Sequence, residues 1–199
     1  MSEPVRTRTL DDTTRASDPG RVRLSRRKLK LLRPDLFGFR AFLRRLASSD
    51  SQLTYIEEQL QHGDSRAAVV VRADPLLVAA YTDELDCVAV LRFPEAVGAA
   101  YSLAAGARLL TVNTYGRGGA YQPDLIPGPN RYDRWTAFHP IIAEFVSDDV
   151  ARIEARKAQI PGPEWERAAA LGAAYLAAKP GVSRDGRPVF AAVPAGEGA

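Results

Sequence analysis

Three carboxylates fall within four positions of one short polar stretch, TDELD, at residues 82–86. They belong to Asp83, Glu84 and Asp86, and carboxylate oxygens are the ligands that hard cations such as Mg²⁺ prefer. A metal ion held in this way can assist phosphoryl transfer, so these are candidate catalytic residues of a metal-assisted phosphoesterase or a nucleotidyl-transfer-type enzyme. The stretch also lies between two apolar runs, and a solvated hairpin turn explains the same acids without any chemistry.

The chain offers few other groups for catalysis: one cysteine, Cys87, and two histidines, His62 and His139. Cys87 alternates with apolar residues of the same run, and a free cysteine on an apolar face is usually a small core residue. His139 precedes a proline, which favours an extended backbone there, and we keep it as a candidate catalytic residue. This set cannot build a zinc site of the usual Cys/His kind, and we expect neither a metal nor a cofactor.

A second candidate site is the segment 114–135, which has neither helical nor strand periodicity and is rich in Gly, Pro, Tyr and Arg. Loops longer than ~12–15 residues without their own secondary structure are usually functional or disordered, and exposed aromatic rings gain nothing in water. These two points favour an ordered loop that packs back on the body. Its guanidinium groups could bind an anion while its rings supply stacking faces; alternatively, the rings fill the edge of the core and the Gly and Pro residues only shape turns. The candidate binding residues are Tyr115, Arg117, Tyr121, Arg131, Tyr132, Arg134 and Trp135.

Basic charge is concentrated towards the N-terminus. Residues 1–46 carry thirteen Lys/Arg and five Asp/Glu, whereas the rest of the chain carries fourteen and nineteen. The segment 21–45 could therefore bind nucleic acid or an acidic protein, and its interleaved leucines suit an anionic membrane surface equally well. The alternative is a solvated basic face of a helix that packs on its own body. The candidate residues are Arg26, Arg27, Lys28, Lys30, Arg33, Arg40, Arg44 and Arg45.

The spacing of apolar residues predicts an α+β fold. Helical periodicity predicts helices near 34–61 and 148–178, which would cover a small, mostly antiparallel sheet of about four strands. Both faces of the run 87–93 are apolar, which indicates a strand covered on both sides. The run 137–146 is compatible with either a strand or a helix. The four predicted strands are 67–71, 76–81, 87–93 and 107–115.

Length and composition fit one domain with flanking tails. The chain has 199 residues, of which 46% are hydrophobic and 26% charged, as is typical of a globular domain with a core. In this interpretation residues 1–33 form a basic, largely disordered tail, residues 34–190 a single α+β domain, and residues 191–199 a frayed end. There is no run of 18 apolar residues, no recognisable secretory signal and only one cysteine, so we expect a cytoplasmic protein without a transmembrane segment.

Three functional hypotheses follow from these residues. The first is a non-catalytic cytoplasmic binding or adaptor protein that uses the basic segment and the loop. The second is the metal-assisted enzyme, with Asp83, Glu84 and Asp86 as its acids. The third is a structural subunit of a larger complex. Because no complete catalytic motif is present, the sequence favours the first hypothesis, a protein that is not an enzyme.

Overall fold

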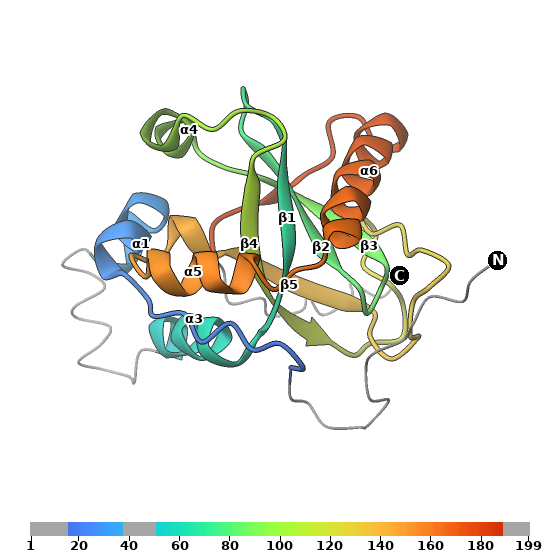
Figure 1. The fold of residues 1–199 in the computed structure, drawn as a ribbon, viewed down its shortest axis with the longest axis horizontal. Helices are drawn as coiled ribbons and strands as arrows, with labels where there is room; N and C mark the ends of the chain where they lie inside the picture. Colours follow the sequence, from blue (N-terminus) through green and yellow to red (C-terminus); the bar gives the residue numbers. More distant parts are fainter. Residues whose placement is uncertain (1–15, 38–50, 189–199) are drawn as a thin grey trace, which may run out of the picture.

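The centre of the fold is a curled sheet of mixed strand direction. The computed structural model describes residues 16–37 and 51–188, and within them the sheet has six strands in the order β5-β4-β1-β2-β3-β6 (Figure 1). Neighbouring strands are antiparallel except for β3 and β6, which are parallel. The strands are β1 (Asp64–Arg72), β2 (Leu77–Thr82), β3 (Cys87–Arg92), β4 (Arg108–Gly116), β5 (Ala137–Ile142) and β6 (Arg184–Asp185).

The predicted α+β class is confirmed, whereas the prediction of about four antiparallel strands is only roughly right. The four predicted runs form β1 to β4, and two further strands complete the sheet. The first six residues of the ambiguous run 137–146 form β5, and the next three form the 3-10 turn η2 (Ala143–Phe145). Pro140 is tolerated because β5 is an outer strand, where a missing amide hydrogen leaves no ladder bond unmade. β6 is only two residues long and pairs with the end of β3.

Helices of the described residues pack on this sheet. α6 lies against β1, β2 and β3, while α3 and α5 lie against β4 (Figure 1). Helices are therefore present where the sequence predicts them near 51–61 and 148–178. The helices are α1 (Arg26–Leu32), α3 (Ser51–His62), α4 (Glu95–Tyr101), α5 (Val150–Lys157) and α6 (Gly162–Ala178), and two 3-10 turns, η1 (Pro34–Leu36) and η2 (Ala143–Phe145), accompany them.

β1 is buried on both of its faces. Successive side chains of a strand point to opposite sides, so alternate residues of β1 pack in different clusters. Ala67 and Val69 pack in the cluster that includes α6. Ala68 and Val70 pack in a second cluster, to which α1, α3 and α5 contribute. Residues 87–91 of β3 are also buried, as the apolar pattern on both of its faces predicts.

The segment 16–33 belongs to the folded body, which corrects the prediction of a loose tail as far as residue 33. Val22 and Leu29 are fully buried. α1 begins at a capped end, since the Ser25 hydroxyl accepts a hydrogen bond from the amide of Lys28. The apolar face of this helix packs near α4 and η2, and that burial outweighs the polar composition of the segment.

The 3-10 turn η1 occupies the place where the sequence predicts a longer helix to begin. Residues 38–50, which hold the remainder of that predicted helix, lie outside the described residues. The same is true of residues 1–15 and 189–199. The single domain predicted for 34–190 therefore has to be extended towards the N-terminus, while its C-terminal limit stays a prediction.

β1 and β2 separate near the end where β1 begins. Their pairing stops at Ala68 and Ala80, although both strands continue beyond this point. There the amide of Ala67 donates to the carboxylate of Glu164, in the first turn of α6, at 2.8 Å. Polar side chains occupy this end of the sheet, and one of them, Asn113 of β4, donates to a main-chain carbonyl of β2. The candidate site lies at this end of the sheet.

Candidate functional site: the long loop and its anchors

The turn between β2 and β3, residues 83–86, accepts main-chain hydrogen bonds from a long loop. The long loop, residues 117–136, joins β4 to β5. The amide of Gly128 donates to the carbonyl of Leu85 at 3.0 Å, and the amide of Tyr132 donates to the carbonyl of Glu84 at 2.9 Å. The acidic turn and the loop, which the sequence presents as two separate candidate sites, are thus parts of one assembly.

Asp86, the last acid of the turn, links the turn to the loop and to α6. Its side chain is 3% exposed, and its two oxygens accept hydrogen bonds from Arg167 of α6 at 3.1 and 2.7 Å. The Tyr81 hydroxyl and the amide of Asn130 also donate to it, at 3.3 and 3.2 Å. Gly128 passes so close that a Cβ there would collide with the carbonyl and carboxylate of Asp86. The hydrogen bond with Asp86 raises the pKa of Arg167.

Asp83 faces a different arginine, Arg66 of β1, whose side chain is 7% exposed. Asp83, Asp64 and Asp18 lie 2.9, 3.0 and 3.0 Å from its guanidinium nitrogens. The Tyr115 hydroxyl donates to Asp64 at 3.4 Å. A nearly buried cation is costly unless it is paired, and here three segments of the chain each supply a carboxylate. We call Arg66 and these three acids the Arg66 cluster.

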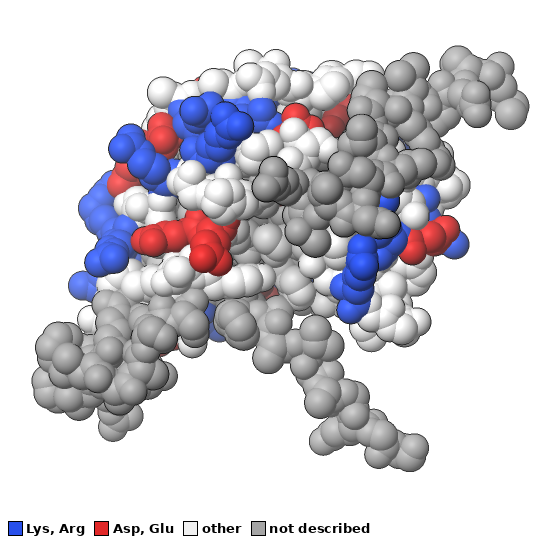
Figure 2. Space-filling model, turned by 90° about the horizontal axis from the view of Figure 1, so that it is seen from below, with Lys and Arg blue, Asp and Glu red and all other residues white. Residues whose placement is uncertain are grey.

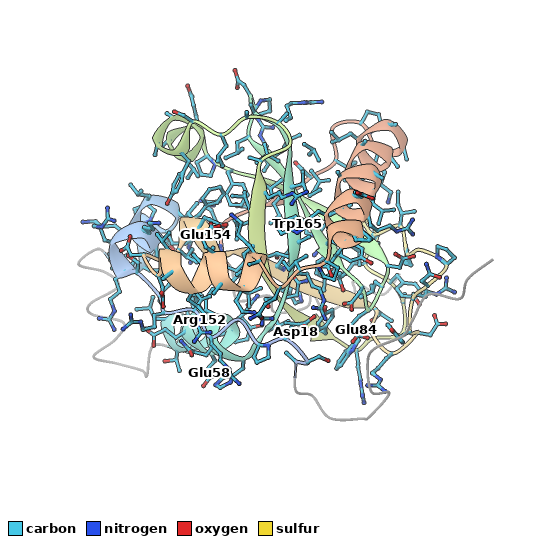
Figure 3. The ribbon with its side chains drawn as sticks, in the orientation of Figure 1. Asp18, Glu58, Glu84, Arg152, Glu154 and Trp165 are labelled. Atoms are coloured by element: carbon cyan, nitrogen blue, oxygen red, sulfur yellow. The ribbon has the colours of Figure 1, made fainter. Side chains whose placement is uncertain are left out.

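The positive charge of these arginines bears directly on the metal site considered from the sequence. Among residues 16–37 and 51–188, no group of three His, Cys, Asp or Glu side chains is arranged to hold a metal ion. Arg66 and Arg167 already bind oxygens of Asp83 and Asp86, at 2.9 and 2.7 Å, so a cation bound there would meet their positive charge. Glu84 lies at the lower end of the sheet in Figure 3, and its main-chain carbonyl supports the loop. In this arrangement the acids of the turn anchor the loop and the arginines.

Burial controls the protonation of the two other candidate groups. It raises the pKa of the Cys87 thiol to about 12, so the thiol stays protonated, as suits a small core residue. Burial, with a smaller contribution from the charge of Arg184, lowers the pKa of His139, so its imidazole is neutral at pH 7. His139 is half-buried in β5 and stays a candidate only.

Aromatic rings and guanidinium groups form a continuous chain of contacts across the base of the loop. The guanidinium of Arg117 lies 5.0 Å from the ring centroid of Trp135, which is 5.7 Å from that of Tyr115. The Tyr115 and Phe138 centroids are 6.5 Å apart, and the guanidinium of Arg184 lies 5.4 Å from the Phe138 ring. Cation–π and offset ring contacts of this kind favour one arrangement of the loop over others. We call these five residues the ring stack.

Arg184 also fixes the first half of the loop. It donates to the carboxylate of Asp124 at 2.6 and 3.0 Å and to the side-chain oxygen of Gln122 at 2.5 Å. At the end of α6, Lys179 donates to the carbonyl of Pro123 at 2.6 Å. The loop is therefore held from β6 and α6 as well as from the β2–β3 turn.

The remaining predicted binding residues of the loop differ in how far they are exposed to solvent. The Tyr121 hydroxyl donates to Asp133 at 2.8 Å, and Arg131 pairs with the same carboxylate. The guanidinium of Arg131 also lies 5.8 Å from the Tyr121 ring. Binding by these residues stays a prediction. The structure leaves Arg117 and Arg131 exposed and half-buries Tyr115, Tyr121, Tyr132, Arg134 and Trp135.

Part of the predicted basic surface is paired with acids of the same molecule. Arg33 pairs with Asp35, while Arg27 and Lys28 pair with Asp148. Figure 2 shows Lys and Arg side chains in separate groups, several with Asp or Glu beside them. These pairings match the alternative interpretation of a basic helix face that packs on its own body. Arg26 and Lys30 are exposed, and Arg40, Arg44 and Arg45 lie outside the described residues.

Three arginines that organise the site, Arg66, Arg167 and Arg184, carry little signal in the sequence. Of the three, only Arg66 has a recognisable sequence signal, because it is a charged residue at the start of an apolar strand. Arg167 and Arg184 are separated by 81 and 60 positions from their partners, Asp86 and Asp124. Only the tertiary fold brings these pairs together, so neither composition nor spacing identifies them.

Comparison with protein-family models, with curated protein sequences and with solved structures found no match. In the described part of the chain, no helix has both the length and the apolar character that spanning a membrane requires.

Proposed function

We propose that the protein is a non-catalytic binding module that presents the long loop to an anionic partner. The observation that supports this proposal most is the fixation of the loop, through main-chain hydrogen bonds to the β2–β3 turn and through the ring stack. Arg117 stands at one end of that stack and is exposed. A loop that is ordered before binding loses little conformational entropy when its partner arrives, which favours affinity.

Arg117 differs in its pairing from the arginines around it. Arg131, Arg167 and Arg184 each form an ion pair with a carboxylate, whereas no described carboxylate pairs with Arg117. Its neighbour Gly118 is exposed and adds no side chain that could block an approaching partner. A guanidinium group on an indole face keeps N–H donors for a phosphate, sulfate or carboxylate group.

The contacts of the acidic turn weigh against the metal-assisted enzyme. Asp83 and Asp86 are engaged by Arg66 and Arg167, and both arginines would have to move before a metal ion could take their place. Asp86 is itself 3% exposed, and loss of its arginine would leave this carboxylate with one charged partner fewer, which is costly. A binding function needs no such rearrangement.

The basic N-terminal segment contributes less to this proposal than its composition suggests. Among its described candidate residues, Arg26 and Lys30 project from α1 as exposed cations without a described acidic partner. They would add a second, smaller contact for a nucleic acid or an acidic protein. The loop therefore stays the principal surface of the proposal.

Retention of the full chain on heparin at increasing salt tests this function. We expect Arg117→Gln to reduce retention and to lower the slope of log affinity against log salt by roughly 1, because one sulfate contact is lost. Arg152→Gln is the matched control, since Arg152 is an exposed arginine on α5 at the opposite side of the molecule from the loop (Figure 3).

The control separates a specific surface from simple net charge. If the two variants lose retention equally, the loop has no special role in binding anions. If the unsubstituted chain is not retained even at low salt, the proposed anionic partner is wrong.

A further inference from the structure

Residues 18–22 lie along the end of α3 and the start of β1 and form main-chain hydrogen bonds to both, with a backbone that turns at Arg21, where φ is 52°. The amides of Gly20 and Val22 donate to main-chain carbonyls at the end of α3, at 3.0 and 3.1 Å. In the other direction, the carbonyl of Asp18 accepts from the amide of Ser65 at 2.8 Å and from its hydroxyl at 2.6 Å. We call residues 18–22 the N-terminal strap. In Figure 1 it forms part of the blue segment that runs across α3 towards the start of β1.

The strap is recognised at three alternate positions. Asp18 places one carboxylate oxygen 3.0 Å from Arg66 and the other 3.4 Å from Arg156. Gly20 lies where a Cβ would stand 2.7 Å from the carbonyl oxygen of Leu60. Val22 is fully buried. Bound peptides are recognised by this combination, with main-chain bonds giving affinity and side-chain contacts giving specificity.

The groups that bind Asp18 are held in place by contacts with the body of the protein. Arg156 of α5 donates to the Ser65 hydroxyl from two nitrogens, at 3.0 and 2.7 Å. Arg66 is paired with Asp64 as well as with Asp18. Each of the two arginines thus has a second partner that does not belong to the strap. Among the described residues, Asp18 is the carboxylate that pairs with Arg156, so departure of the strap would leave that guanidinium ready for another carboxylate.

The strap is joined to the described body only at its C-terminal side, through residues 23–25, and then α1. One of its side chains, Val22, lies in the main core. Segments that bury little apolar surface open locally at a lower free energy than the core does. A peptide of the same chemistry could therefore replace the strap while the sheet stays folded.

We propose that the groove between α3, α5 and the start of β1 is a recognition site for a peptide segment of a partner that carries one carboxylate, and that the strap occupies it in cis. The fitting ligand has an acidic residue, a glycine two positions later and a small branched aliphatic residue two positions after that. The strap then acts as a competitor that the partner has to displace. This site is separate from the loop surface and does not depend on the function proposed for that surface.

Fluorescence anisotropy with a labelled peptide of residues 16–24, ASDPGRVRL, tests the groove in the full chain. In the unsubstituted protein the strap competes at an effective concentration of ~1 mM, so we expect little binding of a micromolar peptide. Asp18→Asn weakens the strap without removing it. We expect this variant to bind the peptide at least about tenfold more tightly than the unsubstituted chain.

Two controls decide whether the aspartate contact carries the recognition. A peptide with Asn in place of its aspartate should bind the Asp18→Asn protein at least about tenfold more weakly. Adding Arg156→Gln to that protein should reduce the advantage of the peptide with aspartate, while the Arg66 contact remains. Equal binding of both peptides, or no binding by a variant whose circular dichroism is unchanged, would overturn the proposal.

Amide hydrogen exchange in the unsubstituted chain gives an independent test that needs no variant. The amides of Gly20, Val22 and Ser65 should exchange together, at least about tenfold faster than the amide of Val70 in the centre of β1. If all four exchange only through global unfolding, the strap is a permanent part of the fold and the groove is not available to a partner.

Discussion

Glu144 lies where η2 meets the start of β4, and both of its carboxylate oxygens accept from the amide of Leu110, at 3.1 and 3.0 Å. Lys157 of α5 stands 3.5 Å away, while Lys28 and Tyr101 donate to the main-chain carbonyl of the same residue. Burial raises the pKa of Glu144 from 4.5 to about 7, and the amide of Leu110 and the charge of Lys157 oppose the shift. Desolvation of the carboxylate thus outweighs its favourable partners.

The raised pKa predicts a stability that falls as the pH rises. The folded chain holds this proton more tightly than the unfolded chain does. The contribution of Glu144 to the free energy of unfolding is therefore complete below pH 4.5 and is lost as the pH rises through about 7. The shift corresponds to roughly 3 kcal/mol. Urea unfolding at pH 5 and pH 8 measures it.

Glu144→Gln supplies the reference for that measurement, because glutamine keeps the shape and an acceptor oxygen but does not titrate. The loss of stability between the two pH values should be larger in the unsubstituted chain than in the variant by up to about 3 kcal/mol. Identical losses would show that other groups cause the pH dependence.

Among single residues of the candidate site, the sequence shows the acids but not their role. Asp83 and Asp86 stand out because they are close together in a turn. Their partners Arg66 and Arg167 lie 17 and 81 positions away in the sequence, and no local sequence pattern predicts such ion pairs. A carboxylate that binds an arginine and one that binds a metal ion look alike until the fold is known.

At the scale of elements, the β2–β3 turn and the long loop stabilise one another. The turn offers carbonyls and one buried carboxylate, and the loop supplies the amides that need acceptors. A loop of this length would otherwise leave many main-chain groups to water. The ring stack adds contacts between Trp135 at the end of the loop and the flanking strands β4 and β5.

Asp86→Asn tests this mutual support. Asn tolerates the left-handed backbone of this position, where φ is 47°, so the turn itself should persist. Loss of the charge weakens the bonds to Arg167 and to the loop, and we expect a cost of about 1–3 kcal/mol in the free energy of unfolding. Chemical denaturation measures it.

Asp185→Asn is the matched control, since Asp185 also pairs with an arginine, Arg187, but on the surface. Exposed pairs contribute little, and we expect a cost of about 0.5 kcal/mol or less. Equal costs for the two variants would mean that the buried carboxylate does not anchor the loop.

The sequence predicts elements well where apolar periodicity is strong. The runs that form β1 to β4 and the helices α3, α5 and α6 are found close to their predicted places. β5 is ambiguous because its proline disturbs both patterns, and β6 is too short to have a pattern. The segment 16–33 is misassigned because its polar composition hides Val22 and Leu29, whose burial depends on elements far along the chain.

At the scale of the whole molecule, the curl of the sheet brings its two outer strands together. Arg184 of β6 donates to the carbonyl of Phe138 in β5 at 2.6 Å, so one side chain bridges both edges. The same guanidinium holds the loop through Asp124 and ends the ring stack. Closing the sheet and ordering the loop therefore depend on shared contacts, and no local sequence pattern could have predicted this link.

Backbone ¹⁵N relaxation of residues 121–136 in the free protein tests the central claim, a loop held in one conformation before any partner binds. We predict order parameters of about 0.8 or higher, close to those of the flanking strands β4 and β5. Values below about 0.6 through this segment would show a flexible loop and would contradict the account.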